Sequence, residues 1–146
     1  MLGRSLPFRP RRSGGQSLTE FALAVPVFLL VLLTIVEAAA FAYTYTNLQR
    51  AVQEGGRVAA LPGTSEMTQV RDRVVERARP VDVDPADVAI TVNGIECLIE
   101  TCFTARVSGD RVLVTLSFSY QPVGSAVFGA GATFNLPDLS AEFMVE

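Results

Sequence analysis

The fold of this chain is decided by residues 11–37, RRSGGQSLTEFALAVPVFLLVLLTIVE. A basic leader that ends in Gly15 meets a nearly unbroken apolar run, residues 21–36, in which Pro26 and one threonine are the only residues that are not strongly apolar. One carboxylate, Glu20, stands at the head of this run, five residues after Gly15. A basic leader followed by a long apolar run is typical of a segment that is addressed to a membrane.

Residues 21–43 are long enough to cross a membrane as a helix. At ~1.5 Å per residue they extend ~34 Å, and the hydrocarbon core of a bilayer is ~30 Å thick. Several arginines precede the run, and the next is Arg50, so the positive-inside rule predicts a cytoplasmic N-terminus and an extracytoplasmic C-terminal domain. The arginines of the leader are Arg4, Arg9, Arg11 and Arg12. We expect a single-pass protein of the cell (inner) membrane, in contact with the lipid bilayer along this helix.

A removable secretory signal is the alternative to a retained helix. Ala38 and Ala40 offer an A-x-A cleavage site behind an apolar region of suitable size. The apolar run is long for a signal core, however, and the helical pattern continues through the proposed cleavage site. The retained helix is therefore favoured, and the signal remains open as an alternative.

The helical pattern continues well beyond the apolar run. Apolar residues recur at helical spacing on one side and polar residues on the other, until Leu61-Pro62-Gly63 ends the helix. The apolar positions are Leu48, Ala51, Val52, Gly55, Val58 and Ala59. We expect one helix from Ser17 to about Ala60, and three regions: a basic leader at 1–15, the transmembrane half of the helix at 16–43 and an outer domain at 44–146.

The outer domain is predicted to be α+β. A second helix, with Thr64-Ser65-Glu66 as its cap and Arg79-Pro80 as its end, has one apolar face. That face carries Met67, Val70, Val74 and Ala78. Alternation and turn residues predict strands at 88–92, 103–107, 112–120 and 139–145. The order of these elements predicts an antiparallel sheet of 3–4 strands beside the helices.

Residues 121–137 are loop-like, yet Val127, Phe128 and Phe134 among them are apolar. Such residues usually cover the edge of a core, and we expect that role here. Contact with the membrane surface or with a partner is the alternative.

Composition excludes several classes of function. The 146 residues contain no His, and the net charge is −3. All the basic residues are Arg, and because four of them stand in the leader, nothing basic is concentrated on the folded part, so we expect no nucleic acid as a partner. The acids are scattered and there is no Gly-rich phosphate loop, so we expect no enzyme and no cofactor.

Cys97 and Cys102 are the only cysteines. With no His and no second cysteine pair, a zinc site is not expected, and we predict no metal. In an extracytoplasmic domain the prediction is a disulfide that closes a small loop. A redox-active pair is the weaker alternative, because the spacing is not C-x-x-C.

The N-terminal third resembles a known family. A long helix behind a basic leader that ends in Gly resembles type IV pilins, in which a prepilin peptidase cuts after Gly and Glu is the fifth mature residue. The finer resemblance is to TadE-like proteins, pseudopilins of the tight-adherence (Flp-type) pilus system. It covers about 45 residues and rests on Glu20-Phe21-Ala22-Leu23, Pro26, residues 29–33, Glu37, residues 41–45 and residues 48–57, LQRAVQEGGR. Gly56 departs from the Ala that is usual there, and we expect it to loosen the helix.

The resemblance implies a membrane-anchored minor pilin or pseudopilin with a pilin-like α+β fold. It would be processed between Gly15 and Gln16 by a prepilin peptidase. Its partners would be other pilins or pseudopilins and the inner-membrane pilus assembly platform. The alternative function is a membrane-tethered or secreted extracytoplasmic binding module, in which the apolar segment is only an anchor or a signal peptide.

The resemblance also assigns roles to single residues. Glu20, Phe21 and Glu37 are the candidates for processing or assembly. After cleavage the new α-amine of Gln16 would lie one helical turn from Glu20 and neutralise it. A helix-start carboxylate that complements the helix dipole is the alternative for Glu20. Pro26 either kinks the helix or is a tolerated membrane proline.

Glu37 also has two interpretations. Either it lies near the outer headgroups and reaches water, or it pairs with an arginine or polar group of an assembly partner inside the membrane. Tyr43 and Tyr45 fit an interfacial aromatic belt beyond it.

Overall fold

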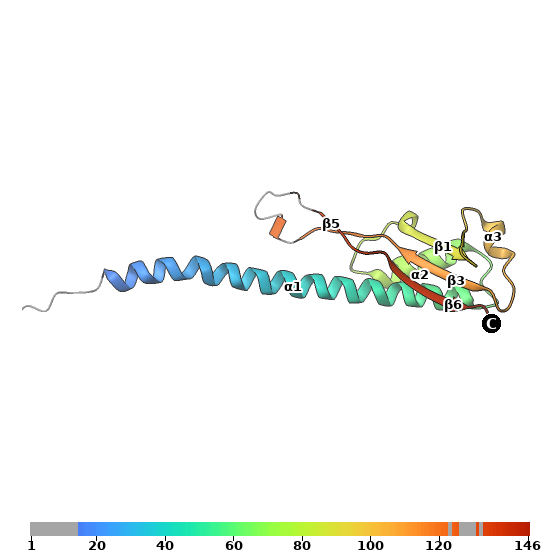
Figure 1. Cartoon of the computed structure of the whole chain (residues 1–146), viewed down its shortest axis with the longest axis horizontal. Coiled ribbons are helices and arrows are strands. Elements are labelled where there is room, and N and C mark those ends of the chain that lie inside the picture. Colours follow the sequence, from blue (N-terminus) through green and yellow to red (C-terminus); the bar gives the residue numbers. More distant parts are fainter. Residues whose placement is uncertain (1–14, 123, 126–130, 132) are drawn as a thin grey trace, which may run out of the picture. The chain divides into compact units, whose positions relative to one another are not determined.

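The computed structural model describes residues 15–122, 124–125, 131 and 133–146 (Figure 1). The chain divides into two compact units, Met1–Val36 and Glu37–Glu146, and the first helix runs through both. The helices are α1 (Gln16–Ala60), α2 (Met67–Ala78), η1 (Pro85–Asp87, a 3-10 helix) and α3 (Glu100–Thr104). The strands are β1 (Val88–Val92), β2 (Ile95–Glu96), β3 (Arg111–Leu116), β4 (Ser119–Tyr120), β5 (Phe134–Asn135) and β6 (Leu139–Met144).

The first part of α1 exposes apolar side chains around its whole circumference. Leu18, Phe21 and Leu23 are each about 70% exposed or more, and the most apolar window of the helix has no buried residue. Among the described residues, α1 is the helix that is long and apolar enough to cross a membrane. The hydroxyl of Thr34, the polar side chain within this run, donates to the Leu30 carbonyl at 2.8 Å and is thereby satisfied inside the helix.

The strands form one four-stranded antiparallel sheet and one short ribbon. The sheet has the order β2-β1-β3-β6, and β4 pairs with β5 in a separate antiparallel ribbon. β1 and β2 are joined by a tight turn in which Asn93 and Gly94 both have positive φ, the conformation that a two-residue hairpin requires. The predicted α+β fold with two helices and an antiparallel sheet is confirmed.

The core lies where the second part of α1 and α2 pack on the sheet. The predicted apolar faces are the buried ones: Leu48, Ala51, Val52 and Ala59 of α1 and Met67, Val70, Val74 and Ala78 of α2. From the sheet, β1 and β3 bury every second residue, as alternation predicts. These residues are Val88, Ile90, Val92, Val112, Val114 and Leu116.

Two adjacent glycines let α1 approach both of its neighbours closely. A Cβ at Gly55 would collide with the Val74 side chain of α2, and a Cβ at Gly56 would lie 2.5 Å from the Phe143 ring of β6. Successive residues on a helix point about 100° apart, so the pair serves two contacts at once. Gly56 was expected to loosen the helix; its role in the fold is to make room for the Phe143 ring.

Two sequence predictions are wrong in detail, and one short strand was not predicted. Residues 103–107 were predicted as a strand, but the chain forms α3 from Glu100 to Thr104, because a disulfide and Arg106 fix this segment locally. The strand predicted at 112–120 is divided after Leu116: β3 belongs to the four-stranded sheet, whereas Ser119 and Tyr120 form β4 and pair with β5 in the separate ribbon. β2, at the edge of the sheet, was not predicted, since two residues carry no detectable alternation.

The cap expected for α2 is also formed differently. The side chain of Glu66 at the N-cap position makes no capping bond, and the Thr64 hydroxyl donates backwards to the Val58 carbonyl of α1 at 2.7 Å. The Met67 amide donates instead to the Glu100 carboxylate of α3 at 2.8 Å. A carboxylate from elsewhere in the chain thus satisfies a free amide and complements the dipole of α2.

We predict that Gly55→Ala destabilises the α+β unit. The added methyl meets the fully buried, β-branched Val74, which has little freedom to move. Overpacking of this kind costs about 1–3 kcal/mol, and it outweighs the gain of about 1 kcal/mol in helix propensity on replacing Gly by Ala. Thermal unfolding of the full chain in detergent, followed by circular dichroism, measures the change.

Gly63→Ala is the matched control, because a Cβ at Gly63 meets nothing within 4 Å. Gly56→Ala is expected to fall between the two, since the Phe143 ring is only partly buried and can turn aside. A Gly55→Ala protein as stable as the control would mean that α1 and α2 do not pack at this point.

Candidate functional site

The junction between leader and helix is fully exposed. Gly15 directly precedes α1, and its carbonyl accepts the first helical bond from the Thr19 amide at 3.3 Å. All residues from Gly15 to Glu20 are exposed, and a Cβ at Gly15 would meet nothing within 4 Å. In the part of the chain that the structure describes, nothing covers the peptide bond between Gly15 and Gln16. The rest of the leader, residues 1–14, lies outside the described residues.

Glu20 lies one helical turn after Gln16, and the two side chains meet. The Gln16 side-chain amide donates to the Glu20 carboxylate at 3.2 Å. The spacing of four residues places the side chains of Gln16 and Glu20 on the same face of the helix, and the N-terminal end of the helix lies one turn from Glu20. An α-amine created at Gln16 by cleavage would therefore have a carboxylate within reach. Phe21 follows with 69% of its surface exposed.

Glu37 has partners within its own chain. The Tyr120 hydroxyl of β4 donates to one carboxylate oxygen at 2.8 Å, and the Gly124 amide donates to the other at 3.1 Å. Both donors are more than 80 residues away in sequence. The carboxylate thus joins the first turn of the Glu37–Glu146 unit to the segment around the β4–β5 ribbon (Figure 1).

Aromatic rings surround this carboxylate. The Phe41 ring lies edge-on to the Tyr120 ring with centroids 5.3 Å apart, and it stacks on Tyr45 at 6.4 Å. Tyr120 is 7% exposed. Burial, and after it the bond to Glu37 and the charge of Glu37, raises the pKa of Tyr120 to about 12, because an ionised phenol would be both desolvated and repelled. Tyr120 is therefore neutral here, and its hydroxyl donates to the Glu37 carboxylate.

The sequence analysis singled out further residues in α1 and in the stretch 121–137. Pro26 lies inside α1, which is one continuous helix through it, so any kink at Pro26 stays a prediction. The assembly roles of Glu20, Phe21 and Glu37 likewise stay predictions. Val127 and Phe128 lie outside the described residues, whereas Phe134 is 59% exposed and pairs across the ribbon with Tyr120.

Cys97 and Cys102 form the predicted disulfide, with their Cα atoms 5.4 Å apart. Cys97 is buried in the core, and its amide donates to the Ile90 carbonyl of β1 at 2.8 Å. The small loop that the bridge closes carries Leu98 and Ile99, which are 81% and 65% exposed. The disulfide therefore ties α3 to the end of the sheet and presents two apolar side chains at the surface.

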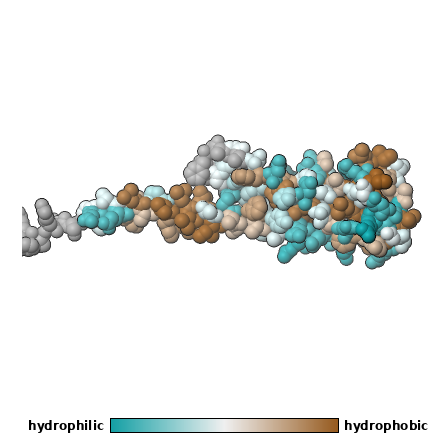
Figure 2. All heavy atoms as spheres, viewed as in Figure 1, coloured by the Kyte–Doolittle hydropathy of each residue, from teal (hydrophilic) through white to brown (hydrophobic). Residues whose placement is uncertain are grey.

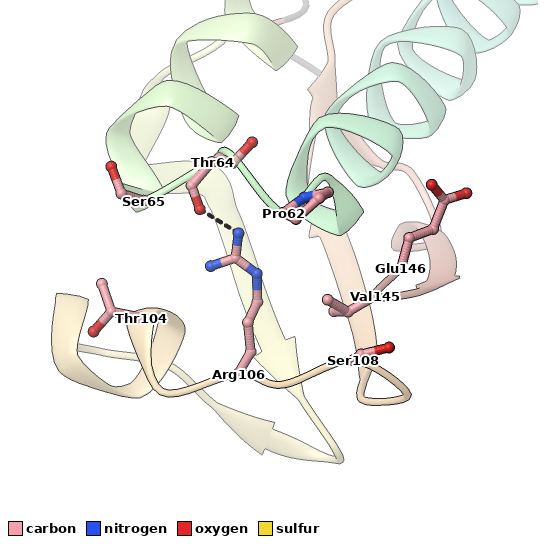
Figure 3. Close-up of a pocket in the computed structure, with 8 residues that line it drawn as sticks. All are labelled: Pro62, Thr64, Ser65, Thr104, Arg106, Ser108, Val145 and Glu146. Atoms are coloured by element: carbon pink, nitrogen blue, oxygen red, sulfur yellow. Dashed lines mark hydrogen bonds between the residues drawn. The ribbon is translucent and has the colours of Figure 1, made fainter.

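Arg106 lines a hollow in the α+β unit and donates hydrogen bonds to backbone carbonyls there (Figure 3). Its guanidinium donates to the carbonyls of Phe103, Leu61 and Thr64 and lies over the Phe103 ring. Desolvation lowers the pKa of Arg106 from its ordinary value. Because the cation is committed to backbone carbonyls, it joins α3 to the turn between α1 and α2 and has a structural role.

Among the described residues, no group of three His, Cys, Asp or Glu is placed to hold a metal ion. In the part of the chain that the structure describes, the fold defines a class of protein: one long helix, apolar enough to serve as a membrane anchor, joined to a small α+β unit. Residues 15–57 match the family model described as TadE-like protein, so the resemblance of this N-terminal segment to the TadE-like family is confirmed. The comparisons with curated proteins and with solved structures found no match.

Sequence reasoning missed the partners of Glu37 and the role of Arg106. Tyr120 ends a strand pattern and Gly124 stands in a loop-like stretch, so neither carries a signal that points to residue 37. Arg106 was placed in a predicted strand, where its side chain would face solvent. The available signal was the lack of any charged residue between Arg111 and Asp138, which indicates a segment set apart from the rest of the surface.

We predict that Tyr120 ionises only well above the pH at which an ordinary tyrosine does. Its folded pKa of about 12 lies above the ordinary tyrosine value of about 10. The bound neutral phenol therefore stabilises the fold fully below pH ~10, and this contribution is lost as the pH rises toward 12. An ultraviolet titration of the phenolates in the full chain should show a late step that Tyr120→Phe removes. If the variant loses an early step instead, Tyr120 is not bonded to Glu37.

We also predict that the disulfide contributes to stability. Closing so short a loop is worth about 2 kcal/mol by the loss of chain entropy in the unfolded state. A reductant should lower the unfolding temperature of the native chain and leave unchanged that of the Cys97→Ser, Cys102→Ser double variant. Titratable free thiols in the untreated native protein would contradict the pairing.

Proposed function

We propose that this protein is a membrane-anchored minor pilin or pseudopilin that supports assembly of a tight-adherence (Flp-type) type IV pilus, and that a prepilin peptidase removes its leader after Gly15. One observation carries the proposal: the TadE-like match begins at Gly15 and covers the apolar half of α1. Its partners would be the peptidase, other pilins or pseudopilins, the inner-membrane assembly platform and the bilayer. No catalytic role is proposed for the chain itself.

The exposed junction supports the cleavage step. A peptidase needs access to the bond between Gly15 and Gln16, and the residues on the helix side of that bond are exposed. After cleavage, the α-amine of Gln16 would lie beside Glu20 and neutralise it. A neutral pair of amine and carboxylate enters the edge of a bilayer at a lower free-energy cost than an isolated carboxylate. The amine and the carboxylate could belong to one subunit or to two neighbouring subunits.

The distribution of charge supports the orientation. Four arginines stand before Gly15, and the next is Arg50, beyond the apolar run. By the positive-inside rule, this distribution favours a leader in the cytoplasm and an α+β unit outside it. The disulfide between Cys97 and Cys102 fits an oxidising compartment on that side.

The continuity of α1 argues against a signal peptide cut near Ala40. The helix runs without a break from Gln16 to Ala60. Cleavage after Ala40 would remove Glu37 and with it the acceptor for Tyr120 and Gly124. It would also cut the helix directly before Phe41, which packs on Tyr120.

A membrane-tethered binding module is the second candidate. It is favoured by an exposed apolar patch over β2 and the disulfide loop, formed by Ile95, Leu98 and Ile99 (Figure 2). Such a patch fits a protein partner. The two functions share the anchor and differ in whether the leader is removed after Gly15.

We predict that the protein in its native membrane begins at Gln16. Intact mass and the N-terminal peptide, measured on protein from a membrane fraction, test this directly. Gly15→Leu should leave the leader attached, because a bulky side chain then stands beside the bond to be cut. The fold is not disturbed, since the space around Gly15 is open.

Gly63→Leu is the matched control, because Gly63 also has open surroundings and lies far from the junction in sequence. It should be processed like the native chain. A native chain that begins at Met1 in cells that process other prepilins would support the tethered binding module. A chain that begins near Phe41 would support an ordinary secreted protein.

A further inference from the structure

The β4–β5 ribbon belongs to a segment without charge. From Val112 to Pro137 the sequence contains no Asp, Glu, Lys or Arg, and the part of this stretch beyond β3 includes both strands of the ribbon. Two of the ribbon's four residues are aromatic, Tyr120 and Phe134, and they face each other across the strands. A long uncharged stretch with aromatic residues differs from an ordinary solvated surface.

Glu37 fixes the position of this ribbon along α1. The carboxylate binds the Tyr120 hydroxyl and the Gly124 amide, and Phe41 packs on the Tyr120 ring. The ribbon is therefore held beside the turn of α1 that directly follows the apolar run. Tyr120 turns toward α1 and is buried, whereas Phe134 is 59% exposed.

The proposed anchor places the outer edge of the bilayer at this same turn. From Gln16 to Val36, α1 extends ~31 Å at ~1.5 Å per residue, which matches a hydrocarbon core of ~30 Å. Glu37 then lies at the boundary, where a carboxylate with two hydrogen-bond donors is tolerated. Tyr43 and Phe41, which are 60% and 41% exposed, follow within two turns. Aromatic residues concentrate at this depth in membrane proteins.

We propose that the β4–β5 ribbon contacts the headgroup region of the phospholipid bilayer, at the same depth as the aromatic residues Phe41 and Tyr43 of α1. The inference rests on the proposed membrane anchor. In it Glu37 is a positioning residue: it binds its own chain so that Phe134 meets the lipid. The aromatic belt is thereby built from two segments that are distant in sequence. The lack of charge lets the ribbon approach the bilayer without desolvating an ion.

The chain contains no Trp, so a single introduced Trp reports its own surroundings. The experiment uses the full chain in vesicles of phosphatidylcholine and phosphatidylglycerol, with and without bromine on the acyl chains near the headgroups. Phe134→Trp is the test variant. Val107→Trp is the matched control. Val107 is 64% exposed and lies before the start of β3, whereas the ribbon lies beyond the end of β3. Phe28→Trp, at a position 61% exposed within the apolar run, reports the anchor itself.

We expect the emission of Phe134→Trp to be blue-shifted and quenched by brominated lipid several-fold more than that of Val107→Trp. Adding Tyr120→Phe removes one bond to Glu37 and keeps the ring that packs on Phe41. It should reduce the quenching at position 134 and leave it unchanged at position 28.

Two results overturn the inference alone. One is quenching at position 134 equal to that at position 107 while position 28 is strongly quenched. The other is a Trp at position 134 that is shielded from aqueous acrylamide but not quenched by brominated lipid, since a protein surface then covers it. Absence of quenching at position 28 overturns the anchor, and with it both the proposed function and this inference.

Discussion

Burial of one face of α1 against the sheet is the interaction on which the α+β unit depends. Leu48, Ala51 and Val52 contribute the helix side of the core, and β1 and β3 contribute alternate residues from the other side. α2 can join this core only because Gly55 has no side chain where Val74 approaches. A helix that was fully apolar throughout could not specify which face to bury. The change from an apolar helix to an amphipathic one, near the start of the Glu37–Glu146 unit, therefore defines where the folded unit begins.

Contacts at the edges of that core then fix the connecting segments. Asn47 of α1 donates to the Ala78 carbonyl at 2.6 Å and so satisfies the C-terminal end of α2, while Glu100 satisfies its N-terminal end. Arg106 bonds to carbonyls on both sides of the turn between the helices. Each of these side chains comes from a different element, so the connections are determined by tertiary contacts and carry weak local sequence signals.

This distinction explains how far the sequence predicts the fold. α1, α2, β1, β3 and β6 were predicted because each repeats an apolar period over several residues. The segment at 103–107 was predicted as a strand because Phe103 and Val107 are strand-favouring residues. The disulfide and the Arg106 contacts override that propensity, and Phe103 becomes a buried residue of a short helix. The Cys pairing was predictable, since the chain has only two cysteines, but its effect on the local backbone was not.

The same distinction between local patterns and tertiary contacts applies to the candidate site. The sequence indicates Glu20 and Glu37 as candidates, because a carboxylate within or beside a long apolar run is conspicuous, and it indicates Gly15 by its spacing from Glu20. It does not indicate the bonds of Glu37, because Tyr120 lies 83 residues away and nothing in its local pattern distinguishes it.

The two carboxylates that frame the apolar run are accommodated by different means. Glu20 is exposed, and Gln16, one turn before it, is its only hydrogen-bond partner in the described part of the chain. It therefore suits a contact that changes when the chain is cut or meets a neighbour. Glu37 accepts from a buried tyrosine and a backbone amide of its own chain. Removing it would leave both donors without their acceptor, which costs more than losing a solvated group. The charge at the end of the apolar segment thus serves folding, whereas under the proposed function the charge at its start would serve association.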